Sequence, residues 1–187
     1  MHDTSRPSRS LRPATLADAE AIAALHADVW RAIYRALAPV AAIAALNEAH
    51  RLQQWQSMLT TKTDEAITLV AIQDDVIVGF ARVAPPQEPL FGDRRELKYL
   101  YVARSQARRG IGRALLQHLA GLERRAGTRG IGLGVVAGNA PAIAFYQALA
   151  ARPVGRYQDP GPLWRSDNLL YAWDDLSVLA DGSVSGG

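Results

Sequence analysis

The sequence has no cysteine among its 187 residues. This absence excludes disulfide bonds, thiolate metal sites and a cysteine nucleophile, and it is compatible with a reducing compartment. No apolar run approaches the roughly 20 residues that a membrane helix needs. The polar start, MHDTSRPSRS, lacks the hydrophobic region of a secretory signal. We therefore expect a cytoplasmic protein that has no membrane partner.

Charge imbalance is also small, because 21 Lys and Arg stand against 18 Asp and Glu, for a net charge of +3. Dense basic runs with interleaved aromatic residues are typical of nucleic-acid binders, and none is present, so we expect no nucleic-acid partner. Histidine is scarce as well. His2, His26, His50 and His118 lack the spacing of a zinc-binding helix, which leaves no candidate metal site.

What is present is the composition of one folded domain, with 49% hydrophobic and 21% charged residues. We expect a single domain over residues 10–178. Residues 1–9 and 179–187 are polar or rich in Gly and Ser, which predicts flexible ends.

The hydrophobic pattern predicts an order of elements. The first third is a short strand at 11–13 followed by helices, one opened by a capping box at Thr15 and Asp18, one running on to Leu46, and one capped by Asn47. A strand hairpin turns at Asp74 and Asp75. The rest of the expected order is a strand at 95–103, a helix at 109–125, a strand at 131–136, a helix from Asn139 to about Ala150 and a strand at 168–173.

The junction between the strand at 95–103 and the next helix is the first candidate site. Gly110 and Gly112 allow the backbone to approach a ligand closely, and the first turn of a helix offers free N–H groups and a positive dipole end. Arg104, Arg108, Arg109 and Arg113 surround the same turn. This combination favours a pyrophosphate site, and the alternative is a plain helix start with solvated arginines.

A second glycine motif, at 132–137, matches the dinucleotide fingerprint G-x-G-x-x-A by letter. That fingerprint requires a strand before it and a helix that begins within it. Here the match is itself the expected strand, and the helix begins only after Asn139. We therefore reject a nicotinamide dinucleotide site.

The segment LYVARSQARRGIGRALL, from Leu100 to Leu116, resembles the pyrophosphate motif of the GNAT superfamily of N-acetyltransferases, R/Q-x-x-G-x-G/A after a strand L-Y-V. Ala107 occupies the R/Q position, which is a departure from the pattern. A second family signature, N-x-x-A-x-x-F-Y, resembles the stretch from Asn139 to Tyr146, with alanines at 140 and 142. The similarity covers roughly residues 11–173.

The resemblance implies an α/β (α+β) fold with a mixed, mostly antiparallel sheet of about six or seven strands flanked by helices. It also implies acetyl-CoA as co-substrate and an amine as acceptor. The implied cofactor-binding residues are Leu100, Tyr101, Val102, Arg108, Arg109, Gly110, Ile111, Gly112, Arg113, Asn139 and Tyr146. The alternative is a sensor or scaffold that binds acyl-CoA without chemistry.

Acetyl transfer needs a base for the amine and a proton for the departing thiolate. Glu96, near the start of its strand, is the candidate base, directly or through water, and the alternative is an ion pair with a neighbouring basic residue. Tyr146 lies two helical turns from Asn139, on the same side, and its phenol is the candidate acid. A packed core tyrosine is the alternative there.

The acceptor is not identified by the sequence: a small amine, an amino acid, a peptide and an antibiotic all remain open. In the similar family, acceptor selection falls to the early helices and a late loop. This places Trp30, Tyr34, Trp164 and Asp167 as candidate substrate residues. We expect either a monomer or a homodimer.

Overall fold

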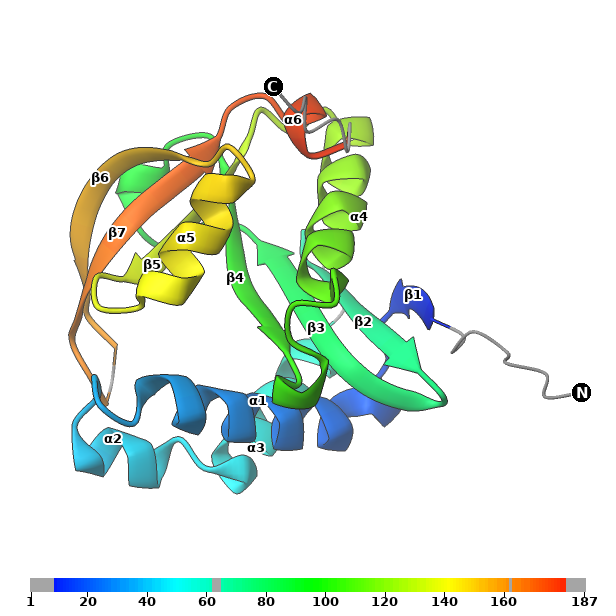
Figure 1. Cartoon of the computed structure of the whole chain (residues 1–187), viewed down its shortest axis with the longest axis vertical. Coiled ribbons are helices and arrows are strands. Elements are labelled where there is room, and N and C mark those ends of the chain that lie inside the picture. Colours follow the sequence, from blue (N-terminus) through cyan, green and yellow to red (C-terminus); the bar gives the residue numbers. More distant parts are fainter. Residues whose placement is uncertain (1–8, 62–64, 162, 181–187) are drawn as a thin grey trace, which may run out of the picture.

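The structure is a computed structural model, and it describes residues 9–61, 65–161 and 163–180. The strands are β1 (Arg9–Pro13), β2 (Ile67–Gln73), β3 (Val76–Ala84), β4 (Arg95–Val102), β5 (Ile131–Val136), β6 (Arg152–Asp159) and β7 (Ser166–Trp173). The α-helices are α1 (Ala19–Tyr34), α2 (Val40–Ala45), α3 (Glu48–Thr60), α4 (Ile111–Arg125), α5 (Ala140–Ala148) and α6 (Ser177–Ala180). After the first strand, three α-helices are followed by three strands, and helices and strands alternate only from β4 to β6 (Figure 1).

All strands belong to one seven-stranded sheet with the order β1-β2-β3-β4-β5-β7-β6. Every neighbouring pair is antiparallel except β4 and β5, which are parallel. The expected mixed, mostly antiparallel sheet of six or seven strands with flanking helices is confirmed.

The parallel pair is joined only at its start. Arg95 pairs with Ile131 and Glu96 with Gly132, and no further residue pairs connect the two strands. Beyond Glu96 the strands separate, so each exposes backbone N–H and C=O groups toward the other that no strand satisfies. This opening is the feature of the fold that determines the position of the site.

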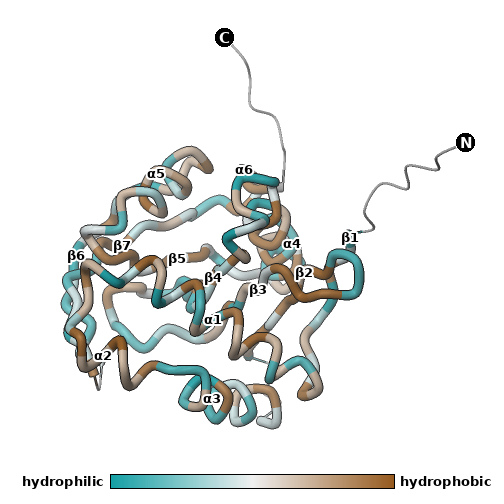
Figure 2. The backbone as a smooth tube through the Cα atoms, turned by 60° about the horizontal axis from the view of Figure 1, so that its bottom comes forward, coloured by the Kyte–Doolittle hydropathy of each residue, from teal (hydrophilic) through white to brown (hydrophobic). Residues whose placement is uncertain are grey.

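The helices cover both faces of the sheet. On one face α1 and α3 pack around a small core that includes Ile22, Trp55 and Phe80. Trp55 donates its indole N–H to Nδ1 of buried His26 at 3.1 Å, which ties α3 to α1. On the other face α4, α5 and α6 cover a larger core. Figure 2 shows the hydrophobic residues concentrated in the central strands and the more hydrophilic ones toward the periphery.

Local signals in the sequence account for several boundaries. The capping box of Thr15 and Asp18 is present, and Arg12 donates to both carboxylate oxygens of Asp18 at 2.7 and 2.8 Å. The Asn47 side chain accepts a hydrogen bond from the His50 N–H, which confirms the predicted cap of α3. Asp74 and Asp75 both have positive φ, as a tight hairpin turn requires.

Three differences from expectation stand out. The helix expected to run on to Leu46 stops at Tyr34 and restarts as α2, because Pro39 lacks an N–H and cannot continue it. Strand β6 was not predicted, since RPVGRYQD has few apolar residues and carries a proline at its second position. Expected flexible residues 1–8 and 181–187 lie outside the described residues, whereas Arg9 belongs to β1 and residues 179–180 to α6. None of the described helices is long and apolar enough to cross a membrane.

Candidate active site

A cavity of about 330 Å³ lies between the end of β4, the start of α4 and helix α5. We call it the α4 cavity. Every predicted cofactor-binding residue lines it except Arg109 and Asn139. Gly112 is in its wall, and a Cβ placed there would point toward Phe145 at 3.5 Å. A bulky side chain at this position would therefore fill the cavity.

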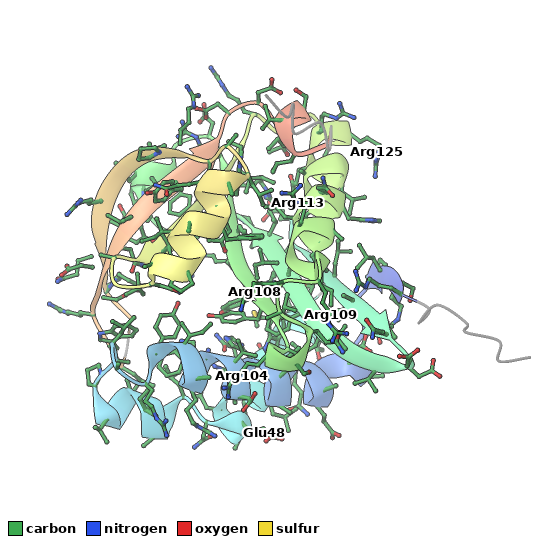
Figure 3. The ribbon with its side chains drawn as sticks, viewed as in Figure 1. Glu48, Arg104, Arg108, Arg109, Arg113 and Arg125 are labelled. Atoms are coloured by element: carbon green, nitrogen blue, oxygen red, sulfur yellow. The ribbon has the colours of Figure 1, made fainter. Side chains whose placement is uncertain are left out.

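The turn into α4 has the geometry of an anion site. Arg108 and Gly110 have φ values of 60° and 79°, and Gly110 is the residue before the first turn of a 15-residue helix. Alternating left-handed residues direct successive backbone N–H groups to one side, where the helix dipole is also positive. Arg104, Arg108 and Arg109 lie around this turn in Figure 3, and Arg113 follows on α4. Arg108 and Arg113 line the α4 cavity, whereas the carbonyl oxygen of Arg109 accepts a bond from Arg9.

A narrow hollow of about 90 Å³ lies where β4 and β5 separate, and we call it the strand gap. It is lined by residues 97–101 of β4 and 133–135 of β5, together with Tyr34, Asn139 and Tyr146. Leu100, Tyr101 and Tyr146 line the α4 cavity as well. The strand gap therefore adjoins the α4 cavity.

On the other side, the strand gap meets a wide cleft of about 560 Å³. Tyr34, Tyr99 and Tyr101 line both, and Tyr101 lines all three spaces. The walls of the wide cleft come from α1, α3, β4, β5, β7 and the β6–β7 connection. Trp30, Tyr34 and Trp164, all predicted as substrate residues, meet there with ring centroids 5.1 to 6.3 Å apart.

Tyr146 is a buried residue whose phenol belongs to both the α4 cavity and the strand gap. Burial raises its pKa well above the ordinary value, and the nearby Tyr34 adds to the rise. The phenol therefore keeps its proton at every physiological pH. Asn139, at the other end of the predicted signature, caps α5 through a bond from the Ala142 N–H at 3.3 Å and also lines the strand gap. Tyr146 and Asn139 were expected to face the same side of α5, and both do line the strand gap.

Glu96, the predicted base, forms an ion pair with Lys98 at 2.5 Å and accepts a weaker bond from the Gln87 N–H at 3.3 Å. It does not line the wide cleft or the strand gap. It lines a side hollow of about 230 Å³, which shares Lys98 and Tyr99 with the wide cleft. The ion pair considered from the sequence as the alternative is the arrangement that the structure has.

The model of the acetyltransferase (GNAT) family matches residues 28–150. The chain belongs to this family. It is 28% identical over 170 residues to the uncharacterized N-acetyltransferase YuaI of Bacillus subtilis, covering 91% of this chain and 95% of the relative.

Two solved structures show how similar the fold is. The ribosomal-protein-alanine N-acetyltransferase of Brucella melitensis is 28% identical with a TM-score of 0.68, over 88% of this chain and 99% of that one. The PaiA N-acetyltransferase of Thermoplasma acidophilum, solved with coenzyme A, has a TM-score of 0.71 at 16% identity, over 90% and 99%. As a member of the family, the chain is an acetyl-CoA-dependent N-acetyltransferase with an unidentified acceptor.

The acceptor side of this acetyltransferase departs from the sequence prediction at Asp167. Successive residues of a strand point to opposite faces, and in β7 Ser166 and Asn168 line the wide cleft while Asp167 between them is exposed and accepts from Gln158. The carboxylate that does line the wide cleft is Asp159, at the end of the unpredicted strand β6.

Sequence reasoning also missed several polar residues of the wide cleft, notably Arg51, Gln54 and Lys98. A signal for Arg51 was available. Arg51 stands four residues before Trp55, so both lie on the buried face of α3. A charged residue on the buried face of a helix is unusual. No comparable signal marks Gln54 or Lys98.

Proposed function

We propose that acetyl-CoA lies across the α4 cavity with its thioester in the strand gap, and that the acceptor amine enters from the wide cleft. One observation carries this assignment: β4 and β5 separate after Glu96, and the resulting gap shares lining residues with a cavity at a helix N-terminus and with an aromatic cleft. Tyr101, which lines all three spaces, marks the point where thioester and amine meet.

The pyrophosphate is assigned to the turn into α4. Its backbone N–H groups, the dipole of α4 and the side chains of Arg108 and Arg113 all favour a doubly charged anion. The coenzyme A bound by the Thermoplasma acidophilum protein of the same fold supports this assignment. Ala107 lines the same cavity through a small apolar side chain, so binding rests on the backbone at that position.

The pantetheine arm and the thioester carbonyl are assigned to the free edge of β4. Beyond Glu96 the backbone groups of β4 that face β5 have no strand partner, and an extended arm with amide groups can bond to such an edge as an added strand would. N–H groups around Leu100 to Val102 would polarise the thioester carbonyl and stabilise the oxyanion that develops on it.

Tyr146 is assigned as the acid. As the amine attacks, the carbon–sulfur bond breaks and negative charge gathers on sulfur, and a phenol at the border of cavity and gap donates its hydrogen bond and proton there. Its raised pKa ensures that the phenol is protonated when the thiolate leaves.

Glu96 is assigned as the base, acting through water. Its side hollow shares Tyr99 and Lys98 with the wide cleft, which gives a path for a proton from the acceptor ammonium. Removal of this carboxylate would slow deprotonation of the amine rather than binding of acetyl-CoA, because Glu96 does not line the α4 cavity.

The test is a panel of amines that spans amino acids, polyamines, peptides with free N-termini and aminoglycosides. Each is incubated with acetyl-CoA, and transfer is followed by thiol release and by the mass of the product. We expect one class to gain an acetyl group with equal release of thiol. Saturable acetyl-CoA binding without transfer to any class would instead support the sensor alternative.

A further inference from the structure

Arg51, on α3, is a buried cation in the wall of the wide cleft. Only 5% of the surface of this residue is accessible to solvent. Its guanidinium lies 5.7 Å from the ring centroid of Trp30, and Nη1 donates to the side-chain oxygen of Gln54 at 3.0 Å. A guanidinium has five N–H donors, so most of its bonding capacity remains unused by these contacts.

No carboxylate neutralises this charge within the described part of the chain. The ion pairs formed by residues 9–61, 65–161 and 163–180 do not include Arg51, and its buried Nε has no hydrogen-bond partner among them. Burial lowers its pKa, and the groups that oppose this are three phenols, Tyr101, Tyr99 and Tyr34. Buried charges are nearly always paired, because desolvation costs several kcal/mol per ion.

The other charged groups of the wide cleft already have partners or contact solvent. Lys98 is neutralised by Glu96 at 2.5 Å, and Asp159 accepts the Gly161 N–H at 2.9 Å. His50 is exposed. Among the described residues of the wide cleft, Arg51 is therefore the buried charge that still lacks an anionic partner.

Arg51 is also close to the point of reaction. The three phenols that influence it, Tyr34, Tyr99 and Tyr101, all line the strand gap as well as the wide cleft. These shared phenols place Arg51 on the side of the wide cleft that adjoins the strand gap, so one small molecule can present an amine to the gap and an acid group to Arg51.

We propose that Arg51 binds the carboxylate of the acetyl acceptor, and that the acceptor is a free amino acid. This rests on the proposed function of the wide cleft. A planar guanidinium forms paired hydrogen bonds with a carboxylate, which fixes the orientation of the molecule as well as its charge. The ammonium first loses one proton to the base, and the neutral amine nitrogen then bonds to the acetyl carbon. The carbon–sulfur bond breaks, the thiolate takes a proton from Tyr146, and the second nitrogen proton lost as the amide forms restores the phenol, so one proton is released overall. The carboxylate is unchanged.

The test compares matched pairs, each a free L-amino acid and its carboxamide, with side chains that are basic, neutral and acidic. A carboxamide keeps the amine and the side chain but removes the negative charge. We expect kcat/KM to favour the acid over the amide by about tenfold or more, since each of the two charge-assisted bonds contributes roughly twice as much as a neutral hydrogen bond. Most of the difference should appear in KM, because the carboxylate does not react.

Variants separate recognition from structure. Arg51→Gln should bring the ratio of acid to amide close to one, whereas Arg51→Lys, which keeps the charge but loses the fork, should retain part of the preference. Arg31→Gln, an exposed arginine of α1 outside the cleft, serves as the matched control and should leave the ratio unchanged. Affinity for acetyl-CoA should be the same in all four proteins.

Three results would overturn the inference. These are equal turnover of acids and amides, an unchanged preference in a folded Arg51→Gln protein, and acetylation of polyamines or peptides but of no amino acid. Only the absence of acetyl transfer to every amine would count against the proposed function, so the two failures are distinguishable.

Discussion

Replacing Tyr146 by phenylalanine removes one oxygen atom and tests the acid role directly. The ring packs edge-on against Phe145 and Trp173, with centroids 5.2 and 6.1 Å away, and phenylalanine can keep both contacts. The hydroxyl forms no side-chain hydrogen bond with a described residue, and it borders the α4 cavity and the strand gap. The free energy of unfolding should therefore change by less than about 1 kcal/mol.

The rate should respond far more. A general acid contributes about 10²-fold or more, which corresponds to at least about 2.7 kcal/mol of activation free energy. The measurement is a single turnover of enzyme preloaded with acetyl-CoA, because slow product release can hide a loss in the chemical step. Since burial raises the pKa of Tyr146 above its ordinary value of about 10, the parental rate should show no titration of this group below about pH 9.

Tyr171→Phe is the matched control. Tyr171 is also buried, lies outside the three spaces of the site and accepts a hydrogen bond from Gln147 at 3.1 Å. Its loss should lower stability by about 1 kcal/mol and leave the transfer rate intact. If the Tyr146→Phe protein transfers acetyl at the parental rate in a single turnover, the assignment of Tyr146 as the acid is wrong.

Three further predictions concern other parts of the molecule. Trp164→Ala should raise the acceptor KM about tenfold or more with unchanged acetyl-CoA affinity, because the ring lines only the wide cleft; weaker acetyl-CoA binding would contradict this. Asp18 has its pKa lowered to about 2 by Arg12, so it stabilises the fold above its unfolded pKa of about 3.9, and this contribution is lost as the pH falls toward about 2. Allowing for the exposed Arg12, Asp18→Asn should cost about 1 kcal/mol in urea unfolding at about pH 7 and progressively less as the pH falls through about 2. At about 0.15 M salt the arginines near Gly110 should give no sequence-selective binding to duplex DNA, and a specific gel shift that resists salt would refute this.

Much of the fold was predictable because its boundaries depend on local chemistry. The capping box at Thr15, the cap at Asn47 and the Asp74–Asp75 turn each satisfy backbone groups within a few residues. The residue pattern alone gave the bounds of β5, Ile131–Val136, without error. Strand β6 could not be predicted from the residue pattern. Its residues are mostly exposed, so burial imposes little alternation on them, and it is ordered by pairing with β7.

The α4 cavity could be predicted from the sequence more fully than the wide cleft, again because local patterns describe only local structure. The α4 cavity is built largely from one continuous segment, residues 100–113, so a motif in the sequence describes it. The wide cleft gathers residues from α1, α3, β4, β5, β7 and the β6–β7 connection, and no local pattern records that meeting. Trp30, Tyr34 and Trp164 were found through their family positions. Asp167 was misplaced because the phase of β7 is set by its partner strands.

Binding of acetyl-CoA is the measurement closest to the central claim, and calorimetry of the parental protein beside Gly112→Trp and Gly121→Trp provides it. Both glycines lie on α4, but only Gly112 lines the α4 cavity, while a Cβ at Gly121 would meet only the end of Arg125. We predict saturable binding by the parental protein and the Gly121 variant, and a loss of affinity of about 100-fold or more, about 2.7 kcal/mol, in the Gly112 variant. Equal affinity in the three folded proteins would contradict the assignment of the α4 cavity to the cofactor.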